Sequence, residues 1–371
     1  MTPRLRLRFF AHSWRSDWNH GNAHFLRGLA DELRKLGHEV RCYEPDHAWS
    51  FVNLLKEPSA PASLRLFEEY FPDLSSSSSR YSLDNFAQFA ETELRAADVV
   101  VVHEWNAPRL AETILSLKKR FGFRLLFHDT HHRAYTSPAE IGKFPIGAFD
   151  GVLAFGEAIR RIYVQAFGAR RAWTFHEAAD TARFYPRTRT EPVEVNWIGN
   201  WGDDERTSEL REFLVEPLAS LRPLRAAVYG VRYPEDAKGQ LRDAGIRYRG
   251  YLPNLSAPFV YAQSALTLHI PRRCYANGLS GIPTIRMFEA FACGVPLISS
   301  PWEDLEGLFR PNQDFVSVPD GRAMAAEIRH LLRDDRAGKQ LSTQALETIQ
   351  KHHSCLHRAR QFEQICEELG K

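Results

Sequence analysis

Cysteine is scarce in this chain, and long apolar runs are absent. The 371 residues contain five cysteines, an odd number, and none of them forms a Cys-x-x-Cys pair. This scarcity argues against a disulfide framework and a zinc site, and it favours a reducing, cytoplasmic environment. No apolar run approaches the ~20 residues that a membrane span needs. We therefore expect a soluble protein with at most peripheral membrane contact.

An excess of charge of one sign is also absent. The 48 Lys and Arg residues nearly balance the 46 Asp and Glu residues, which leaves a formal net charge of +2. A chain-wide basic field that could hold nucleic acid by its phosphates is thereby excluded, so we expect no nucleic-acid partner. The composition, 44% hydrophobic and 25% charged, is that of a globular protein. The length of the chain is typical of two domains.

Short apolar segments alternate with helical stretches in the first half of the chain. Leu5–Phe10 predicts a strand, residues 25–36 predict an amphipathic helix that ends at Gly37, and Val40–Tyr43 predicts a second strand. Further buried strands are expected at residues 99–102, 125–127 and 152–155, with helices at 109–120 and 157–167. This α/β alternation is typical of a Rossmann-like domain, in which helices cover both faces of a parallel sheet.

A polar segment flanked by prolines, residues 186–192, is the best candidate for a linker. It divides the chain into an N-terminal Rossmann-like domain, residues 1–186, and a C-terminal one, residues 187–353. The second domain repeats the alternation, with strands expected at 193–198, 226–229, 266–270 and 296–299. Residues 57–80, which contain three prolines and a serine run, are expected to form a mobile surface insertion in the first domain.

The segment Gly281–Ile298 is the part of the sequence that indicates chemistry most clearly. A Gly-Pro loop opens a short helix at Thr284 and Ile285, and Glu289 lies inside that helix. Such a loop and helix N-terminus offer N–H groups and a positive dipole end, both suited to a phosphate. A carboxylate further along the helix can accept hydrogen bonds from two sugar hydroxyls.

This segment resembles the donor-binding motif of group 1 glycosyltransferases, whose GT-B fold has two Rossmann-like domains facing each other across a cleft. Three further matches follow in the family order: His20-Gly21-Asn22 with Gly37-His38-Glu39-Val40, then Ala179–Pro186, then Trp197-Ile198-Gly199-Asn200-Trp201. Residues 128–132 and 283–286 resemble the spore-maturation (CgeB-like) branch of the family.

The resemblance implies a hexosyltransferase-like enzyme that works without a metal or another cofactor. The donor would be a nucleotide-diphosphate sugar held by the C-terminal domain. The acceptor would be a glycan, a lipid-linked glycan, a protein or a small molecule, held by the N-terminal domain. Glu289 would bind the nucleotide ribose, and residues 354–371 would form a helix that packs back on the N-terminal domain.

The sequence departs from the family pattern at two places. Many members carry a second glutamate eight positions before the one that corresponds to Glu289, and this second glutamate contacts the transferred sugar. In this chain that position is Gly281. The arginine-lysine pair that often neutralises the diphosphate is not evident at the turn of Gly199 and Asn200, both expected to bind substrate. The cations that could replace it are Arg206, Arg272, Arg273 and Arg286.

Polar residues follow three of the strands expected in the N-terminal domain. Because open α/β sheets place ligands at the carboxyl ends of their strands, these residues are candidates for catalysis or acceptor orientation. The candidates are His12, Glu104, Asp129 and His131, and Gly21 and Asn22 are expected to bind substrate in the first loop. Metal ligation by residues 128–132 is an alternative, although no further acid or thiol cluster completes a site.

Two other functions fit the same fold. One is a nucleotide-sugar epimerase. The other is a protein that binds a nucleotide sugar without turnover, which Gly281 makes plausible because it stands in place of a glutamate.

Overall fold

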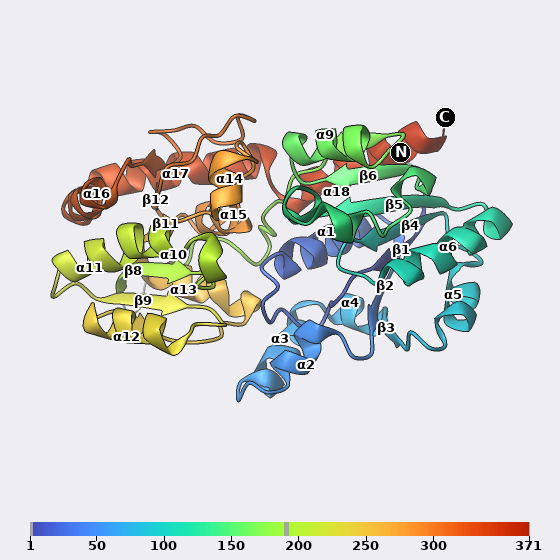
Figure 1. Cartoon of the computed structure of the whole chain (residues 1–371), viewed down its shortest axis with the longest axis horizontal. Coiled ribbons are helices and arrows are strands. Elements are labelled where there is room, and N and C mark those ends of the chain that lie inside the picture. Colours follow the sequence, from blue (N-terminus) through green and yellow to red (C-terminus); the bar gives the residue numbers. More distant parts are fainter. Residues whose placement is uncertain (1–2, 189–192, 371) are drawn as a thin grey trace. The chain divides into compact units, whose positions relative to one another are not determined.

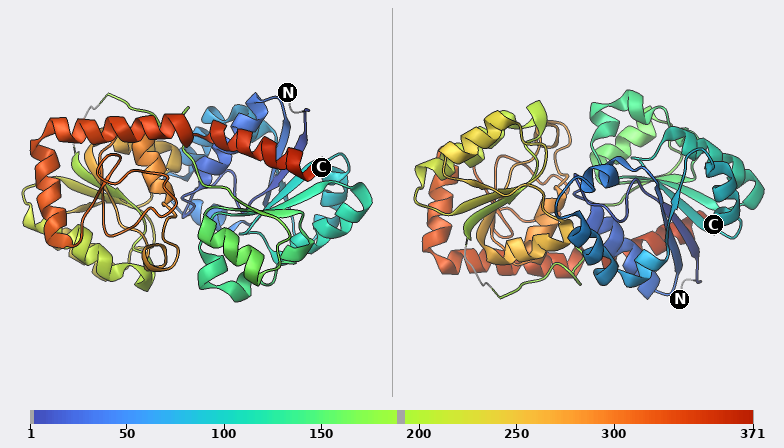
Figure 2. Two further views of the ribbon diagram at one scale, coloured as in Figure 1. Left: turned by 90° about the horizontal axis from the view of Figure 1, so that it is seen from above. Right: turned by 90° about the horizontal axis from the view of Figure 1, so that it is seen from below.

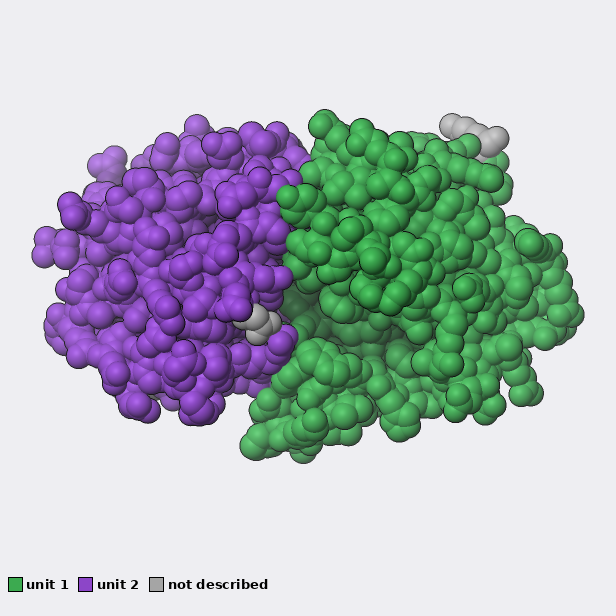
Figure 3. Space-filling model, in the orientation of Figure 1, with its two compact units in different colours: residues 1–177, 355–371 green, residues 178–354 purple. Residues whose placement is uncertain are grey.

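A computed structural model describes residues 3–188 and 193–370 of the chain. It contains two compact units: residues 1–177 with 355–371, and residues 178–354 (Figure 3). The division falls ahead of the linker expected at residues 186–192, of which 189–192 lie outside the described residues. Each unit has its own parallel sheet, which confirms the α/β fold class with two Rossmann-like domains.

The sheet of the first unit has seven strands in the order β3-β2-β1-β4-β5-β6-β7, and all its pairings are parallel (Figure 1). The strands are β1 (Arg6–Phe10), β2 (Glu39–Pro45), β3 (Ser78–Tyr81), β4 (Val99–His103), β5 (Arg124–Asp129), β6 (Gly151–Ala154) and β7 (Ala172–Thr174). The chain passes from β1 to β2 on one side and later to β4 on the other. Strands β1 and β4 therefore form the topological switch point of this sheet.

Helices cover this sheet, which explains why its central strand β4 is a nearly continuous apolar run. Every residue of β4 is buried. The helices are α1 (Ala23–Lys35), α2 (Trp49–Leu54), α3 (Ala60–Tyr70), α4 (Pro72–Ser76), α5 (Phe86–Leu94), α6 (Pro108–Phe121), α7 (Arg133–Thr136), α8 (Pro138–Ile141), the short η1 (Ile146–Ala148) and α9 (Glu157–Ala166). Helix α1 ends before Gly37, whose φ of +98° is one that glycine adopts readily.

Residues 57–80 are not the irregular insertion expected from their composition. They form α3, α4 and β3, and β3 pairs in parallel with β2 at the edge of the sheet. Phe67 and Leu74 are buried, so the segment contributes to the core of the first unit. The prolines misled the prediction because two of them, Pro61 and Pro72, lie in the first turn of a helix, where proline is tolerated.

The last helix, α18 (Cys355–Gly370), belongs to the first unit although it ends the chain. It packs beside α1, and Figure 2 shows it in red next to the blue helices of this unit. Phe362 contacts Phe9 of β1, with 5.8 Å between ring centroids, and Glu363 lies 3.1 Å from Nε2 of His38.

The sheet of the second unit has six strands in the order β10-β9-β8-β11-β12-β13, again all parallel. The strands are β8 (Val193–Ile198), β9 (Ala226–Tyr229), β10 (Arg247–Tyr248), β11 (Ser264–His269), β12 (Leu297–Ser299) and β13 (Val316–Ser317). The chain passes from β8 to β9 on one side and to β11 on the other, so β8 and β11 form the switch point of this sheet.

Helices also cover the second sheet, around a core that contains Leu266, Leu268 and Ile298. A continuous helical segment spans α10 (Thr207–Leu210), the π-helical turn η3 (Arg211–Val215) and α11 (Glu216–Ser220). The others are η2 (Asp203–Glu205), α12 (Glu235–Asp243), η4 (Asn254–Ser256), α13 (Ala257–Gln263), α14 (Arg273–Asn277), α15 (Ile285–Ala292), α16 (Gly321–Arg333) and α17 (Asp335–His352). None of the helices in the described parts of the chain has the length and apolar character needed to cross a membrane.

Candidate active site

The loop after β8 is held in one conformation at the switch point of the second unit. Gly199 donates its N–H to the carbonyl of Tyr229 at 2.8 Å, and the Oδ1 atom of Asn200 accepts from the N–H of Val231 at 3.0 Å. A Cβ atom on Gly230 would lie 2.1 Å from the carbonyl oxygen of Gly199. This close approach of two loops requires glycine, and it places Gly199 and Asn200, both expected to bind substrate, at the carboxyl ends of β8 and β9.

Arg206 links the two loops of this switch point. Its guanidinium donates to the carbonyl of Asn200 after β8 at 2.5 Å and to that of Ile270 after β11 at 3.1 Å. The Nε atom is buried without a hydrogen-bond partner, and no carboxylate among the described residues pairs with the side chain. Burial lowers the pKa of Arg206 to about 10, so it stays charged at neutral pH. A partly buried cation without a counter-charge among the described residues indicates an anion site.

The other three arginines expected at the diphosphate are each paired with a carboxylate. The pairs are Arg272 with Glu205, Arg273 with Glu209 (2.6 Å between Nε and Oε1) and Arg286 with Glu289 (2.5 Å between Nη1 and Oε2). A phosphate has to compete with a carboxylate for any of these three guanidinium groups. The structure therefore favours Arg206 for the diphosphate, a ranking that the sequence alone did not provide.

Glu289 lies in α15 with its carboxylate fully buried. Its Oε1 atom accepts from Nδ2 of Asn254 at 3.0 Å, and its Oε2 atom accepts from the hydroxyl of Tyr261 at 3.2 Å and from Arg286. Sequence analysis missed Asn254 and Tyr261, because neither residue lies in the motif. Glu289 can bind a ribose only if one of these three partners moves away. Arg286 is the partner best able to move, because its side chain is partly exposed.

Thr284 and Ile285 begin helix α15, as the motif predicts. Thr284 has extended backbone angles, its side chain makes no capping hydrogen bond, and its carbonyl accepts from the N–H of Met287 at 3.0 Å. The first turn of this helix leaves N–H groups without helical partners, which is the property that suits a phosphate.

Gly281 has a steric reason to be glycine. Its φ is +96°, and a Cβ atom there would lie 2.9 Å from both the backbone nitrogen and Cγ of Glu306. A glutamate at this position would be strained by its backbone angles and would collide with the loop at Glu306. The loop after β12 thus occupies the space that the longer side chain would need.

Restoring the glutamate that many family members carry is expected to damage this protein. Gly281→Glu should cost at least about 2 kcal/mol of unfolding free energy, from the left-handed backbone and the collision. That cost corresponds to a drop of about 5 °C in the melting temperature. Calorimetry of the variant measures it. Gly307→Ala is the matched control, because Gly307 has φ +69° and open space around its Cβ position. A Gly281→Glu protein more stable than the control would contradict the steric explanation.

Three imidazoles meet at the switch point of the first unit. His12 follows β1, His103 ends β4, and His20 lies in the loop before α1. The ring of His12 lies 4.1 Å from that of His20 and 5.8 Å from that of His103. Burial lowers the pKa of His12 to about 4, so these rings are neutral at physiological pH and can exchange hydrogen bonds with a hydroxyl group.

Glu104 and Asp129, expected as catalytic candidates, are both fully buried. Asp129 accepts from the hydroxyl of Tyr163 at 2.5 Å and from the N–H of His131 at 2.8 Å, and Glu104 pairs with Arg133. Burial raises the pKa of Asp129 to about 6 and that of Glu104 well above its usual value. Oδ1 of Asp129 holds the loop after β5 and Oδ2 binds Tyr163 of α9, which describes a positioning residue better than a catalytic one.

The remaining candidates of the first unit lie in the same loops. His131 is partly exposed and its ring lies 5.1 Å from that of Trp105. Asn22, next to Gly21, donates its Nδ2–H to the carbonyl of Thr130 at 3.0 Å. This bond ties the loop before α1 to the loop after β5. Of the predicted catalytic residues, His12 and His131 are the ones that stay partly exposed.

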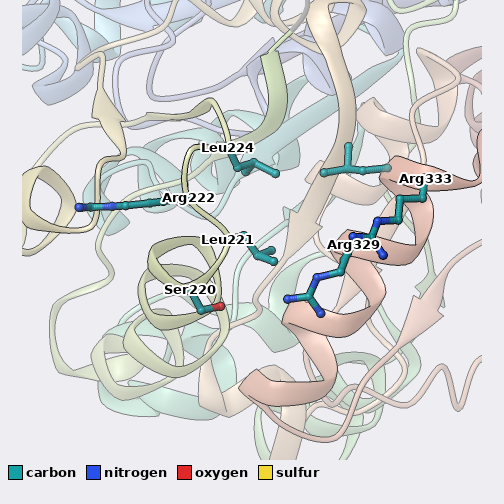
Figure 4. A pocket seen from close by; sticks show the side chains of 7 residues that line it. Ser220, Leu221, Arg222, Leu224, Arg329 and Arg333 are labelled. Atoms are coloured by element: carbon teal, nitrogen blue, oxygen red, sulfur yellow. The ribbon is translucent and has the colours of Figure 1, made fainter.

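A separate hollow of about 380 Å³ lies at the opposite edge of the second sheet. Its lining is Ser220, Leu221, Arg222, Leu224, Arg329, Leu332 and Arg333 (Figure 4). Arg222 points away from Arg329 and Arg333 and donates to the carbonyl of Ala244 at 3.0 Å. Because residues 220–224 lead into the amino end of β9, this hollow is not at the edge where α/β sheets bind ligands.

Metal ligands do not gather in either unit as far as the structure describes it. No group of three or more His, Cys, Asp or Glu side chains in residues 3–188 and 193–370 is arranged to hold a metal ion. Metal-independent chemistry stays a prediction.

Known proteins resemble this chain in part of its sequence and in its fold. Residues 206–364 match the family model described as "Glycosyl transferase-like". No curated protein matches the chain. Among solved structures, the chain is similar to HepE from Anabaena in complex with UDP and glucose, at 12% identity and a TM-score of 0.70, over 98% of this chain and 100% of that one.

Two further solved structures share the fold. One is sucrose-phosphate synthase from Thermosynechococcus elongatus, at 14% identity and a TM-score of 0.66 over 99% of both chains. The other is an alpha-glucosyltransferase in complex with UDP and a 13-mer DNA, at 13% identity and a TM-score of 0.67, over 98% of this chain and 100% of that one. These solved structures show that the chain has the GT-B fold, and residues 206–364, less than half of the chain, match a glycosyltransferase family.

Proposed function

We propose that this protein transfers a sugar from a uridine-diphosphate sugar to an acceptor without a bound metal. The observation that carries the proposal is Arg206, a partly buried cation at the switch point of the second sheet that pairs with no carboxylate of the described residues. A diphosphate supplies the missing negative charge. HepE and the alpha-glucosyltransferase, which share the fold, were solved with UDP, and this supports uridine as the base.

The charge of Arg206 has a role in the reaction as well as in binding. When the bond between sugar and diphosphate breaks, negative charge grows on the leaving diphosphate. A guanidinium already fixed by the carbonyls of Asn200 and Ile270 stabilises that charge without having to reorganise. The first turn of α15, which begins at Ile285, offers additional N–H groups to the same phosphates.

Binding of the ribose to Glu289 would couple two parts of the donor site. Ribose hydroxyls that reach the Glu289 carboxylate replace Arg286, its partly exposed partner. Arg286 lies one helical turn nearer the N-terminus of α15, and once released it can turn to the diphosphate. Nucleotide binding would then recruit a second arginine in addition to Arg206.

The first unit would hold the acceptor. Its neutral imidazole at His12 has an Nδ1 atom that is buried without a partner. His131 is partly exposed, and both rings lie near that of Trp105. A neutral imidazole can accept a hydrogen bond or a proton from an attacking hydroxyl. We also infer membership of the spore-maturation branch and a cytoplasmic location, which rest on the motifs at residues 128–132 and 283–286 and on the cysteine content.

A panel of nucleotide diphosphates and nucleotide sugars tests the proposal. UDP and at least one UDP-sugar are expected to raise the melting temperature, since a ligand at 100 times its dissociation constant stabilises by about 2.7 kcal/mol. Release of UDP from that sugar would show turnover and exclude a non-catalytic binding protein. Interconversion of UDP-GlcNAc and UDP-ManNAc without acceptor would indicate an epimerase instead. Binding of no member of the panel would overturn the proposal.

Removal of divalent metal is expected to leave donor binding unchanged. The diphosphate charge is met by Arg206 and by helix N–H groups, so no metal is needed to neutralise it. UDP titrations with and without EDTA should give the same dissociation constant. Loss of binding on chelation, restored by adding one metal, would contradict this expectation.

A further inference from the structure

His269 ends strand β11, next to the loop that Arg206 holds, and it is buried with 2% of its surface exposed. Its hydrogen bonding determines which ring nitrogen carries the proton. The hydroxyl of Ser299 donates to the carbonyl of Ser300 at 2.7 Å, so the Ser299 oxygen accepts from Nδ1 of His269, 2.9 Å away. Nε2 of His269 is thus an unprotonated acceptor, and it has no hydrogen-bond partner.

Trp302 supplies the complementary group. It follows β12, is 5% exposed, and its ring lies edge-to-face with that of His269, with 5.7 Å between centroids and 84° between planes. The Nε1–H of an indole is a donor only, and here it is buried without a partner. The two rings are in contact, and each carries one buried group without a hydrogen-bond partner: the acceptor Nε2 of His269 and the donor Nε1–H of Trp302. Such groups are costly unless a ligand or water satisfies them.

These two rings lie beside the anion site. The residue after His269 is Ile270, whose carbonyl accepts from Arg206. The charge of Arg206 also helps burial to keep the His269 pKa low, at about 3, so the ring is neutral at any physiological pH. A ligand whose diphosphate met Arg206 would have its neighbouring hydroxyl groups on the side of His269, whose ring contacts that of Trp302.

We propose that His269 and Trp302 form an acceptor and donor pair that recognises one hydroxyl group of the nucleotide sugar. The hydroxyl donates its hydrogen to Nε2 of His269 and accepts the Nε1–H of Trp302. A sugar hydroxyl both donates and accepts, so it satisfies both atoms, whereas a phosphate oxygen cannot donate to Nε2. This proposal rests on the proposed function. The hydroxyl belongs either to the ribose or to the transferred sugar.

Calorimetric titration of Trp302→Phe and His269→Leu with UDP, 2′-deoxy-UDP and UDP-glucose tests the pair. If the hydroxyl is on the transferred sugar, both variants should lose about tenfold in affinity for UDP-glucose and keep wild-type affinity for UDP. If it is the ribose 2′-hydroxyl, both should lose about tenfold for UDP but nothing for 2′-deoxy-UDP. His269→Gln, whose amide oxygen can accept, should recover part of the loss.

Two controls keep the test independent of folding and of the proposed function. Trp173→Phe removes an indole N–H that is bonded to Glu368 in the first unit, and it should bind every ligand as the wild type does. Melting curves show which variants fold. Wild-type affinity of both folded variants for all three ligands would overturn the hydroxyl pair alone. A wild-type protein that binds neither UDP nor UDP-glucose would overturn the proposed function together with it.

Discussion

Arg206→Gln is expected to lose about 100-fold in affinity for UDP while its melting temperature changes little. The affinity falls because a charge-assisted, two-pronged contact to the diphosphate contributes roughly 2 to 3 kcal/mol. Stability changes little because the substitution also removes a partly buried charge that pairs with no carboxylate of the described residues, so the lost bonds to Asn200 and Ile270 are offset by the relieved desolvation. Titration calorimetry and a thermal melt measure the two effects.

A control and a second variant sharpen this experiment. Arg225→Gln removes an exposed arginine at the amino end of β9, which is paired with Glu194, and it should bind UDP as the wild type does. Arg206→Lys keeps the charge but not the two-pronged geometry, so it should lie between the wild type and Arg206→Gln. Unchanged UDP affinity in Arg206→Gln would show that the diphosphate binds elsewhere, with Arg286 as the next arginine to test.

Glu289→Ala is expected to lower the melting temperature by roughly 10 °C. The substitution leaves the buried groups of Asn254 and Tyr261 and the charge of Arg286 without their carboxylate. Breaking a buried pair in this way costs about 3 to 5 kcal/mol, and each kcal/mol shifts the melting temperature of a domain of this size by about 2 to 4 °C. Differential scanning calorimetry in the absence of nucleotide measures the effect.

Glu289→Gln separates the structural role of this carboxylate from its role in binding. The amide keeps the shape and one acceptor oxygen, so this variant should melt closer to the wild type. Its UDP affinity, measured well below the melting temperature, should still fall because the ribose hydroxyls lose a charged acceptor. An alanine variant that melts like the wild type would contradict the buried network around Glu289.

The central strands of both sheets were predictable from the sequence, whereas the edge strands were not. Strand β4 begins with four consecutive valines because helices cover both of its faces, and β11 is buried along nearly its whole length. The edge strands β3, β7, β10 and β13 have only two to four residues and are partly exposed. Sequences this short carry little periodicity, and in β3 the serine run resembled a loop.

The candidate donor-site residues were predictable as a group, but the sequence did not rank them. A resemblance and the strand-end rule pointed to Arg206, Arg286 and Glu289 together. Which arginine keeps a free charge depends on carboxylates that arrive from other elements, such as Glu205 and Glu209, and only the folded chain brings these together. His12 and Glu104 became candidates because they follow predicted strands, and open α/β sheets bind ligands at the carboxyl ends of their strands. The same rule could have identified His269, which ends β11.

Hydrogen–deuterium exchange with and without a saturating UDP-sugar tests the donor site most directly. We expect protection of backbone amides at the carboxyl edge of the second sheet, in residues 198–206, 269–273 and 281–292. These segments contain the Gly199 turn, Arg206, the end of β11 and the first turn of α15. Protection confined to the loops of the first unit, or no protection with a ligand shown to bind, would contradict the placement of the donor.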